Sequence, residues 1–167
     1  MSIVTPTASK FPIPTRCSCG NKFYKHDKRR RHVIEQGKVW YLVRRLRCPV
    51  CKKTHTLLLD NMLPHKHYAA PEIEQVLQNQ EDSTSPPHEC GAEESTLRRW
   101  RREFPQILTN LTYCLLKLAN VSLSLLSETK PLQRLYNTIA LQANPPPIHS
   151  RLAWAFFMSQ FNPVHIG

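Results

Sequence analysis

The apolar residues of this chain follow two different periods, which divide it into a strand-forming first part and a helix-forming remainder. Residues 39–43, Val-Trp-Tyr-Leu-Val, are β-branched, aromatic or aliphatic and predict a strand. Residues 32–35 predict its partner strand, because Gln36-Gly37 between the two segments can form a tight turn. A third strand is predicted over residues 54–59.

Alternation along the second of these strands predicts which side chains face a core. Successive strand residues point to opposite faces, so one face is expected to pack through Trp40, Leu42 and Leu46. The basic run before the hairpin, residues 25–32, is predicted to be a loop. The other face of the strand is expected to carry Tyr41, Val43, Arg45 and Arg47.

From residue 70 onward the apolar positions recur every three or four residues, which is the period of an amphipathic helix. Ile73, Val76 and Leu77 follow this spacing behind Pro71, and proline is well tolerated in a first helical turn. A second helix is expected to start at Glu94 or Ser95 and to be interrupted at Pro105. Three further helices are predicted over residues 106–128, 131–142 and 149–160.

These elements predict an α+β protein, with a small N-terminal β ribbon followed by a mostly α-helical region. Residues 1–69 are assigned to the ribbon with its connector, and residues 70–104 to a unit similar to a helix-turn-helix. Residues 105–167 are assigned to an apolar helical module, which is expected to mediate self-association or to bind a protein partner.

We expect a cytoplasmic protein without a membrane anchor. The first ten residues lack the basic start and long apolar core of an export signal. The predicted helix over residues 106–128 is long enough to span a bilayer. However, Asn110, Lys117 and Asn120 lie inside it, which favours a buried bundle helix.

Positive charge is concentrated at the N-terminal end of the chain. The formal net charge is +11, and residues 1–53 carry fourteen Lys or Arg against two acidic residues. The remaining residues hold nine basic and ten acidic side chains, so the whole excess lies on the predicted ribbon. A concentrated basic field attracts polyanions, and nucleic acid is the commonest of these in a cytoplasm. DNA is therefore the expected partner, with RNA as an open alternative.

Two groups of residues are candidates for contacts with DNA. The segment from Gly91 to Trp100 is typical of the turn and recognition helix of a helix-turn-helix unit, although Pro86 and Pro87 leave little room for its first helix. On this helix the outward candidates are Ser95 and, for base edges, Arg98, Arg99 and Arg102. The candidates for phosphate contacts on the ribbon are Lys25, Lys28, Arg29, Arg30, Arg31, Arg44, Arg45 and Arg47.

Two cysteine pairs flank the basic hairpin, one in the sequence CSCG and one in CPVC. Two close pairs of thiolates can close a tetrahedral zinc shell, which predicts a structural Zn²⁺ bound by Cys17, Cys19, Cys48 and Cys51. Four packed thiols without metal are one alternative. In another, a histidine completes the shell, the candidates being His55, His65 and His67.

No catalytic motif accompanies this predicted site. The sequence has no Gly-rich phosphate loop, HExxH motif or GxSxG motif. A shell of four thiolates also leaves no open position for a metal-bound water. We therefore expect that the protein is not an enzyme.

The order of these motifs resembles a known family. The CSCG pair, the RRLRCPVCKKTH segment, the LPHKHY connector and the ESTLRRWRR helix are similar to uncharacterised bacterial proteins that share a domain of unknown function. Those proteins look like the zinc-ribbon and helix-turn-helix front ends of insertion-sequence transposases. The resemblance covers residues 14–104 and implies DNA binding in a mobile-element or regulatory setting. It implies the same four cysteine ligands, and a recognition helix that includes Ser95, Arg98 and Arg99.

The expected function is that of a zinc-stabilised DNA-binding protein, whose ribbon contacts phosphates and whose arginine helix contacts base edges. The alternative is an adaptor subunit of a larger nucleoprotein complex, in which the arginine helix and the apolar tail contact protein. Salt separates the two, because phosphate contacts weaken steeply with salt and apolar interfaces do not.

Overall fold

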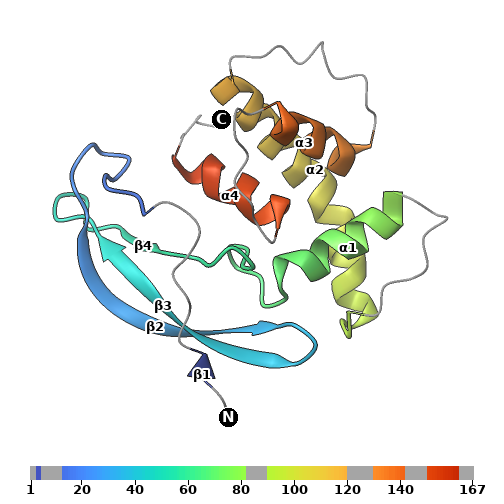
Figure 1. The fold of residues 1–167 in the computed structure, drawn as a ribbon, viewed down its shortest axis with the longest axis horizontal. Helices are drawn as coiled ribbons and strands as arrows, with labels where there is room; N and C mark the ends of the chain where they lie inside the picture. The colour runs from blue at the N-terminus through green and yellow to red at the C-terminus, as the bar shows by residue number, and fades with distance from the viewer. Residues whose placement is uncertain (1–2, 5–12, 82–89, 120–129, 142–149, 162–167) are drawn as a thin grey trace.

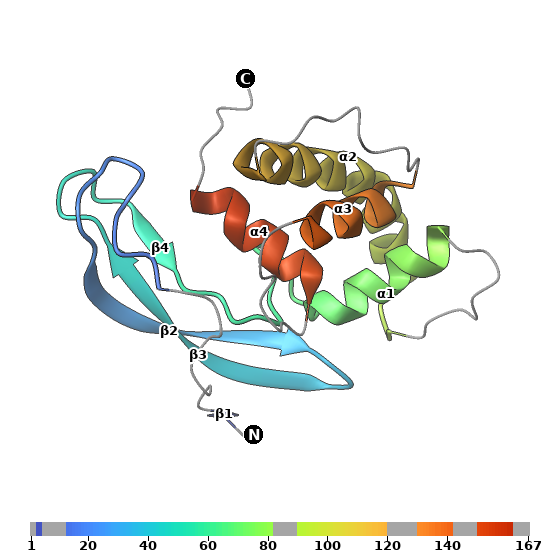
Figure 2. The same ribbon diagram turned by 45° about the horizontal axis from the view of Figure 1, so that its top comes forward.

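The computed structural model describes residues 3–4, 13–81, 90–119, 130–141 and 150–161. A small sheet comes first in the chain and four helices follow it, so the predicted α+β class is confirmed. The sheet and the helices lie side by side (Figure 1). They are joined by residues 57–69, called the connector here, between the last strand and the first helix. Figure 2 shows the helices gathered to one side of the sheet.

The sheet is built around β3, Lys38–Arg47. β2, Tyr24–Ile34, pairs with it in antiparallel register along most of its length. β4, Thr54–Thr56, pairs with the C-terminal end of β3, and the two-residue β1, Ile3–Val4, pairs with β3 in parallel. The β2–β3 turn has positive φ angles of 47° at Gln36 and 145° at Gly37, so the predicted hairpin is confirmed.

β2 is longer than predicted, because it includes the basic run that we expected to be a loop. Arg29 pairs with Val43 of β3, and Arg31 pairs with Tyr41. The neighbouring strand supplies the backbone hydrogen-bond partners, whereas a polar run has no apolar alternation by which its strand could be recognised. β4 is shorter than expected, since its pairing with β3 ends at Thr56.

The two faces of β3 are exchanged relative to the prediction. Tyr41 and Val43 are buried, whereas Trp40 and Leu42 are half-buried. Leu46 is buried, as expected. The connector decides the buried face, because its apolar side chains complete a small core beneath Tyr41 and Val43 together with Val33, the connector residues being Leu59, Met62 and Ala69.

The hydroxyl group of Tyr41 is satisfied in this core. It donates to Glu35 Oε2 at 3.4 Å and accepts a hydrogen bond from Asn61 Nδ2 at 3.3 Å. Asn61 Nδ2 also lies 3.2 Å from Glu35 Oε1. A buried tyrosine needs a partner for its hydroxyl, so these contacts explain why Tyr41 can replace Trp40 on the inner face.

The helices surround a second, larger core with Trp100, Phe104 and Leu115 among its fully buried side chains. Pro71 and Pro131 lie in first helical turns, as predicted. The predicted helical residues 120–128, 142 and 149 lie outside the described residues. Across the described ranges, no helix is both long enough and apolar enough to cross a bilayer. The four helices are α1 (Ala70–Glu81), α2 (Glu94–Ala119), α3 (Pro131–Ala140) and α4 (Arg151–Phe161).

α2 continues through Pro105, where we predicted an interruption. A proline inside a helix removes one backbone hydrogen bond and crowds the preceding turn. Here Phe104 before the proline and Leu108 after it are both buried in the same core. Tertiary packing on both sides therefore outweighs the local cost of the proline.

Two glutamate side chains of α1 cap the N-terminal ends of α3 and α4. Glu81 Oε1 accepts a hydrogen bond from the Leu132 N–H at 2.7 Å, in the first turn of α3. Glu74 Oε1 accepts one from the Leu152 N–H at 2.6 Å, in the first turn of α4. A carboxylate at this position satisfies a free N–H group and the positive end of the helix dipole. The capping residues are 51 and 78 positions away in the chain, so no local sequence pattern reveals them.

Candidate metal centre and basic surface

The four predicted cysteine ligands come together at the open end of the hairpin. Cys17 and Cys19 precede β2, and Cys48 and Cys51 follow β3, so strand pairing brings the two pairs together. All four Sγ atoms lie within 4.8 Å of one another. Cys17 Sγ is 3.5 Å from Cys51 Sγ, and Cys19 Sγ is 3.4 Å from Cys48 Sγ. All four are free thiols, not disulfides.

Each cysteine pair lies in a tight backbone turn. The Gly20 N–H donates to the Cys17 carbonyl at 2.8 Å, and the Lys52 N–H donates to the Cys48 carbonyl at 3.1 Å. Gly20 has a φ of +86°, a conformation that glycine adopts without the steric cost of a Cβ. The one-residue spacing of the first pair is therefore compatible with a closed turn.

The sulfur positions fit a tetrahedral metal ion. Zn–S bonds of about 2.3 Å at tetrahedral angles place the sulfur atoms about 3.8 Å apart. The measured separations of 3.4 and 3.5 Å are close to that value. Thiolates are also the soft ligands that zinc and related ions prefer. The cluster is thus a candidate metal site, with Cys17 and Cys48 buried and Cys19 exposed.

Hydrogen bonds and burial shift the pKa values of Cys19 and Cys51 in opposite directions. The backbone and then the side chain of Asn21 lower the pKa of Cys19 to about 6. The Asn21 Nδ2 atom lies 3.6 Å from Cys19 Sγ. A backbone hydrogen bond at Lys53 lowers the pKa of Cys51, but burial and the neighbouring sulfur atoms raise it to about 11. Thiol ligands bind metals as thiolates, so a metal ion displaces the protons that remain on the cluster.

Of the three histidines considered as further ligands, His55 lies beside the cluster. Its Nε2 atom is 3.8 Å from Cys17 Sγ. Its ring packs edge-on against the ring of Phe23, with 4.6 Å between the ring centroids. With four sulfur atoms already present, His55 is placed to hydrogen-bond a ligand and orient it. His65 and His67 instead line a pocket beside β2.

Most basic residues of the predicted phosphate surface are exposed. β2 pairs on one edge with β3, and its side chains from Tyr24 to Arg30 are all exposed. Arg44 on β3 is exposed as well. The exposed cations of this surface are Lys25, Lys28, Arg29, Arg30 and Arg44.

The other three predicted arginines of the ribbon are half-buried. Arg45 forms a two-pronged ion pair with Asp27, with 2.6 Å between Arg45 Nε and Asp27 Oδ1. Arg31 donates to the carbonyl groups of Leu63 and Lys66 in the connector, at 2.5 and 2.9 Å. Arg31 and Arg45 therefore hold parts of the fold together besides carrying charge. The Arg47 Nε atom is buried without a hydrogen-bond partner among the described residues.

The predicted amphipathic pattern at the start of α2 is confirmed. Trp100 is buried in the helical core, and Ser95, Arg99 and Arg102 are exposed. Arg98 is exposed too and forms an ion pair with Glu94 at 3.4 Å. The two prolines on which the length of a preceding helix depends, Pro86 and Pro87, lie outside the described residues.

Sequence reasoning missed the pocket beside β2. His32 on β2 and His67 on the connector stack there with 4.4 Å between ring centroids. They meet because Ile34 forms an isolated parallel bridge with Tyr68. Such a long-range bridge leaves no periodic signal in the sequence, so the only available sign was the number of histidines.

Comparison with known families identifies the N-terminal half of the chain. The sequence model of one protein family, described as a domain of unknown function (DUF6431), matches residues 17–100. The chain belongs to this family. The DUF6431 region starts at Cys17 and ends at Trp100, so it contains the whole sulfur cluster, the β2–β3 hairpin and the first turns of α2. Neither the curated proteins nor the solved structures contain a match.

Proposed function

We propose that this DUF6431 protein is a zinc-stabilised, non-enzymatic DNA-binding protein that acts in a mobile-element or regulatory setting. The observation that carries the proposal is the row of exposed side chains from Tyr24 to Arg30 on β2, a strand that begins a few residues after the sulfur ligands Cys17 and Cys19. Four of these seven residues are Lys or Arg. A rigid, exposed row of cations is suited to contacts with phosphates.

Zinc has a structural role in this proposal. The ribbon core contains few buried apolar residues, with Val33, Tyr41 and Val43 from its strands. Small β units with so little core commonly gain their folding free energy from a bound metal. Four thiolates fill the coordination shell, so the ion has no free position at which to activate water.

The second contact in this proposal comes from α2. Its buried aromatic side chains fix the helix, and the exposed arginines are then free to approach base edges, Arg99 and Arg102 above all. A bidentate contact from arginine to guanine is the commonest specific pairing in the major groove. RNA is an outcome that the binding experiment below separates from DNA, because both are polyanions.

The test is salt-dependent binding of the zinc-loaded full chain to random duplex DNA, single-stranded DNA and RNA, followed by fluorescence anisotropy. Replacement of Lys25, Lys28 and Arg30 by alanine is expected to weaken binding. The plot of log affinity against log salt should also become flatter, by about 0.9 for each phosphate that the variant no longer neutralises.

The matched control removes the same charge from the helical part, with alanine at Lys117, Lys130 and Arg151. It should leave affinity and slope nearly unchanged, since the proposed phosphate surface is intact. Equal effects of the two triple variants would contradict the proposed surface. An affinity that does not change with salt concentration would favour the protein-binding adaptor.

A further inference from the structure

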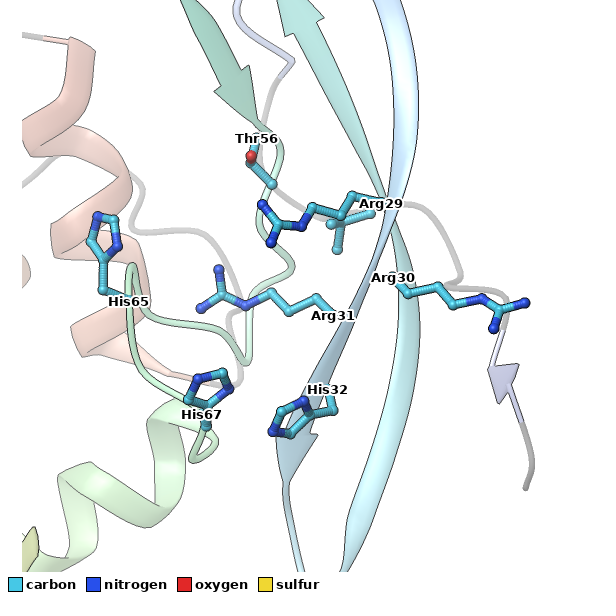
Figure 3. A pocket seen from close by; sticks show the side chains of 8 residues that line it. Arg29, Arg30, Arg31, His32, Thr56, His65 and His67 are labelled. Atoms are coloured by element: carbon cyan, nitrogen blue, oxygen red, sulfur yellow. The ribbon is translucent and has the colours of Figure 1, made fainter.

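A pocket with a volume of about 500 Å³ lies between β2 and the connector. Figure 3 shows it from close by, with Arg29, Arg31 and His32 on one side and His65 and His67 on the other. Thr56 lies at the end of β4 above Arg29. No carboxylate is among the side chains that line it.

Arg29 and Arg31 extend from the same face of β2 toward the connector, whereas the guanidinium of Arg30, which is also among the lining residues, extends from the opposite face (Figure 3). This follows from the alternation of side chains along a strand. The two arginines therefore place two guanidinium groups in one concave space, although the sequence shows only a continuous basic run.

No carboxylate among the described residues lines this pocket to balance its positive charge, and Asp27, which interacts electrostatically with Arg29, is paired with Arg45. Within the described part of the chain, Arg29 forms no side-chain hydrogen bond or salt bridge. Burial, and then repulsion by Arg29, lowers the pKa of Arg31. The Arg31 Nε atom is buried and lacks an acceptor among the described residues, while its Nη2 atom is fixed by two connector carbonyls. An anion would supply the missing acceptor and the missing negative charge.

His32 adds a hydrogen-bond donor to the pocket. His32 and His67 stack nearly parallel, with 11° between their ring planes. Burial, followed by the proximity of His67, lowers the pKa of His32, so its ring is mainly neutral at neutral pH. A neutral imidazole still donates through one nitrogen, as the Thr56 hydroxyl does through its oxygen. The pocket thus combines two guanidinium cations, one of them fixed by the connector, with donors from His32 and Thr56.

We infer that this pocket binds a phosphomonoester group. Such a group carries between about 1.5 and 2 negative charges at pH 7, which two guanidinium groups match, and offers three strong acceptor oxygens. A phosphodiester carries one charge and continues in both directions, so it lies across a surface more readily than it enters a pocket. If the protein binds DNA as proposed above, the phosphomonoester is the phosphorylated end of a DNA strand. This source of the group rests on the proposed function. A free nucleotide carries the same group.

The test compares two blunt duplexes of one sequence, one with 5′-phosphate and one with 5′-hydroxyl ends, bound to the zinc-loaded full chain. Isothermal titration with AMP and with adenosine gives the same comparison without DNA. The phosphorylated member of each pair should bind about tenfold tighter, the equivalent of one added charge-assisted hydrogen bond.

Arg29→Ala should abolish this preference. Lys28→Ala removes the same charge from an exposed residue of the same strand that is not among the residues lining the pocket, so it should weaken both duplexes equally and preserve the ratio. Equal binding of both duplexes, together with equal binding of AMP and adenosine, would overturn the inference, and so would the same loss of ratio in both variants.

The two proposals fail separately in this design. If neither duplex binds but AMP is preferred over adenosine in an Arg29-dependent way, the pocket is supported and the DNA-binding proposal is contradicted. If both duplexes bind alike and AMP shows no preference, the pocket inference is wrong while DNA binding stands.

Discussion

At the scale of single residues, the sulfur cluster depends on a few neighbours of the ligands. Cysteine spacing was sufficient to predict all four members of the cluster, because two close pairs are a strong local signal. The acidity of each thiol could not be predicted in the same way. It depends on the backbone turn around Gly20 and on the contact between Asn21 and Cys19.

Asn21→Ala should make zinc release more sensitive to acid. The hydrogen bonds at Asn21 hold the pKa of Cys19 at about 6, below its ordinary value of 9.0. Loss of the side-chain bond raises that pKa, so protons compete with zinc at higher pH. The midpoint of zinc release on acidification should move up by about half a pH unit, the equivalent of a weak hydrogen bond.

A colorimetric zinc indicator measures this midpoint, and Ser95→Ala, on the exposed side of α2, is the control. A midpoint that stays the same, or moves to lower pH, in Asn21→Ala would show that this side chain does not stabilise the thiolate.

Arg31 shows what residue-level reasoning missed. The sequence places it in the middle of a basic run and predicts a phosphate contact. The structure fixes its guanidinium on two connector carbonyl groups, so it joins β2 to the connector and also lines the pocket. That double role arises from the fold of the connector and has no counterpart in local sequence.

At the scale of elements, α1 organises the helical part by capping its neighbours. Burial raises the pKa of Glu74, while its hydrogen bonds, the largest of them with the Leu152 N–H, oppose this shift. The folded state therefore binds a proton on this group more tightly than the unfolded state. The contribution of Glu74 to stability is greatest below its ordinary pKa of 4.5 and is lost as the pH rises through the raised value.

Two substitutions at Glu74 separate the cap from the charge. Glu74→Ala leaves the Leu152 N–H without its acceptor and should lower the free energy of unfolding by about 2 kcal/mol. Glu74→Gln keeps an acceptor for the Leu152 N–H, so it should lower the free energy of unfolding by less. It should also remove the part of the pH dependence of stability that the titration of Glu74 causes. Urea unfolding followed by circular dichroism measures both effects, with Gln75→Ala on the exposed side of α1 as the control. Equal losses in Glu74→Ala and Gln75→Ala would refute the capping role.

The elements themselves were predicted unevenly. The hairpin turn and the helices α1 and α3, which have Pro71 and Pro131 in their first turns, carry strong local signals and were found. The extent of β2, the buried face of β3 and the continuity of α2 at Pro105 were predicted wrongly. Each of these depends on a partner that is distant in the sequence, namely β3, the connector and the helical core.

At the scale of the whole molecule, the sulfur cluster and the excess positive charge share one region, and the larger apolar core lies in another. The excess positive charge lies within residues 1–53, which also contain the sulfur cluster and the hairpin. The larger core lies among the helices, and the connector joins the two through Leu63 and through the Lys66–Glu103 ion pair at 3.2 Å. The sequence predicted the basic N-terminal region, because the excess of Lys and Arg is confined to residues 1–53.

The central claim is that one zinc ion, held by four sulfur atoms, fixes the basic hairpin. Native mass spectrometry of the zinc-loaded full chain tests it most directly. We expect one zinc per chain, which is lost in Cys48→Ser and retained in Cys90→Ser, a change at a cysteine outside the cluster. A chain that binds no zinc, or a Cys48→Ser variant that retains a full equivalent, would contradict the account.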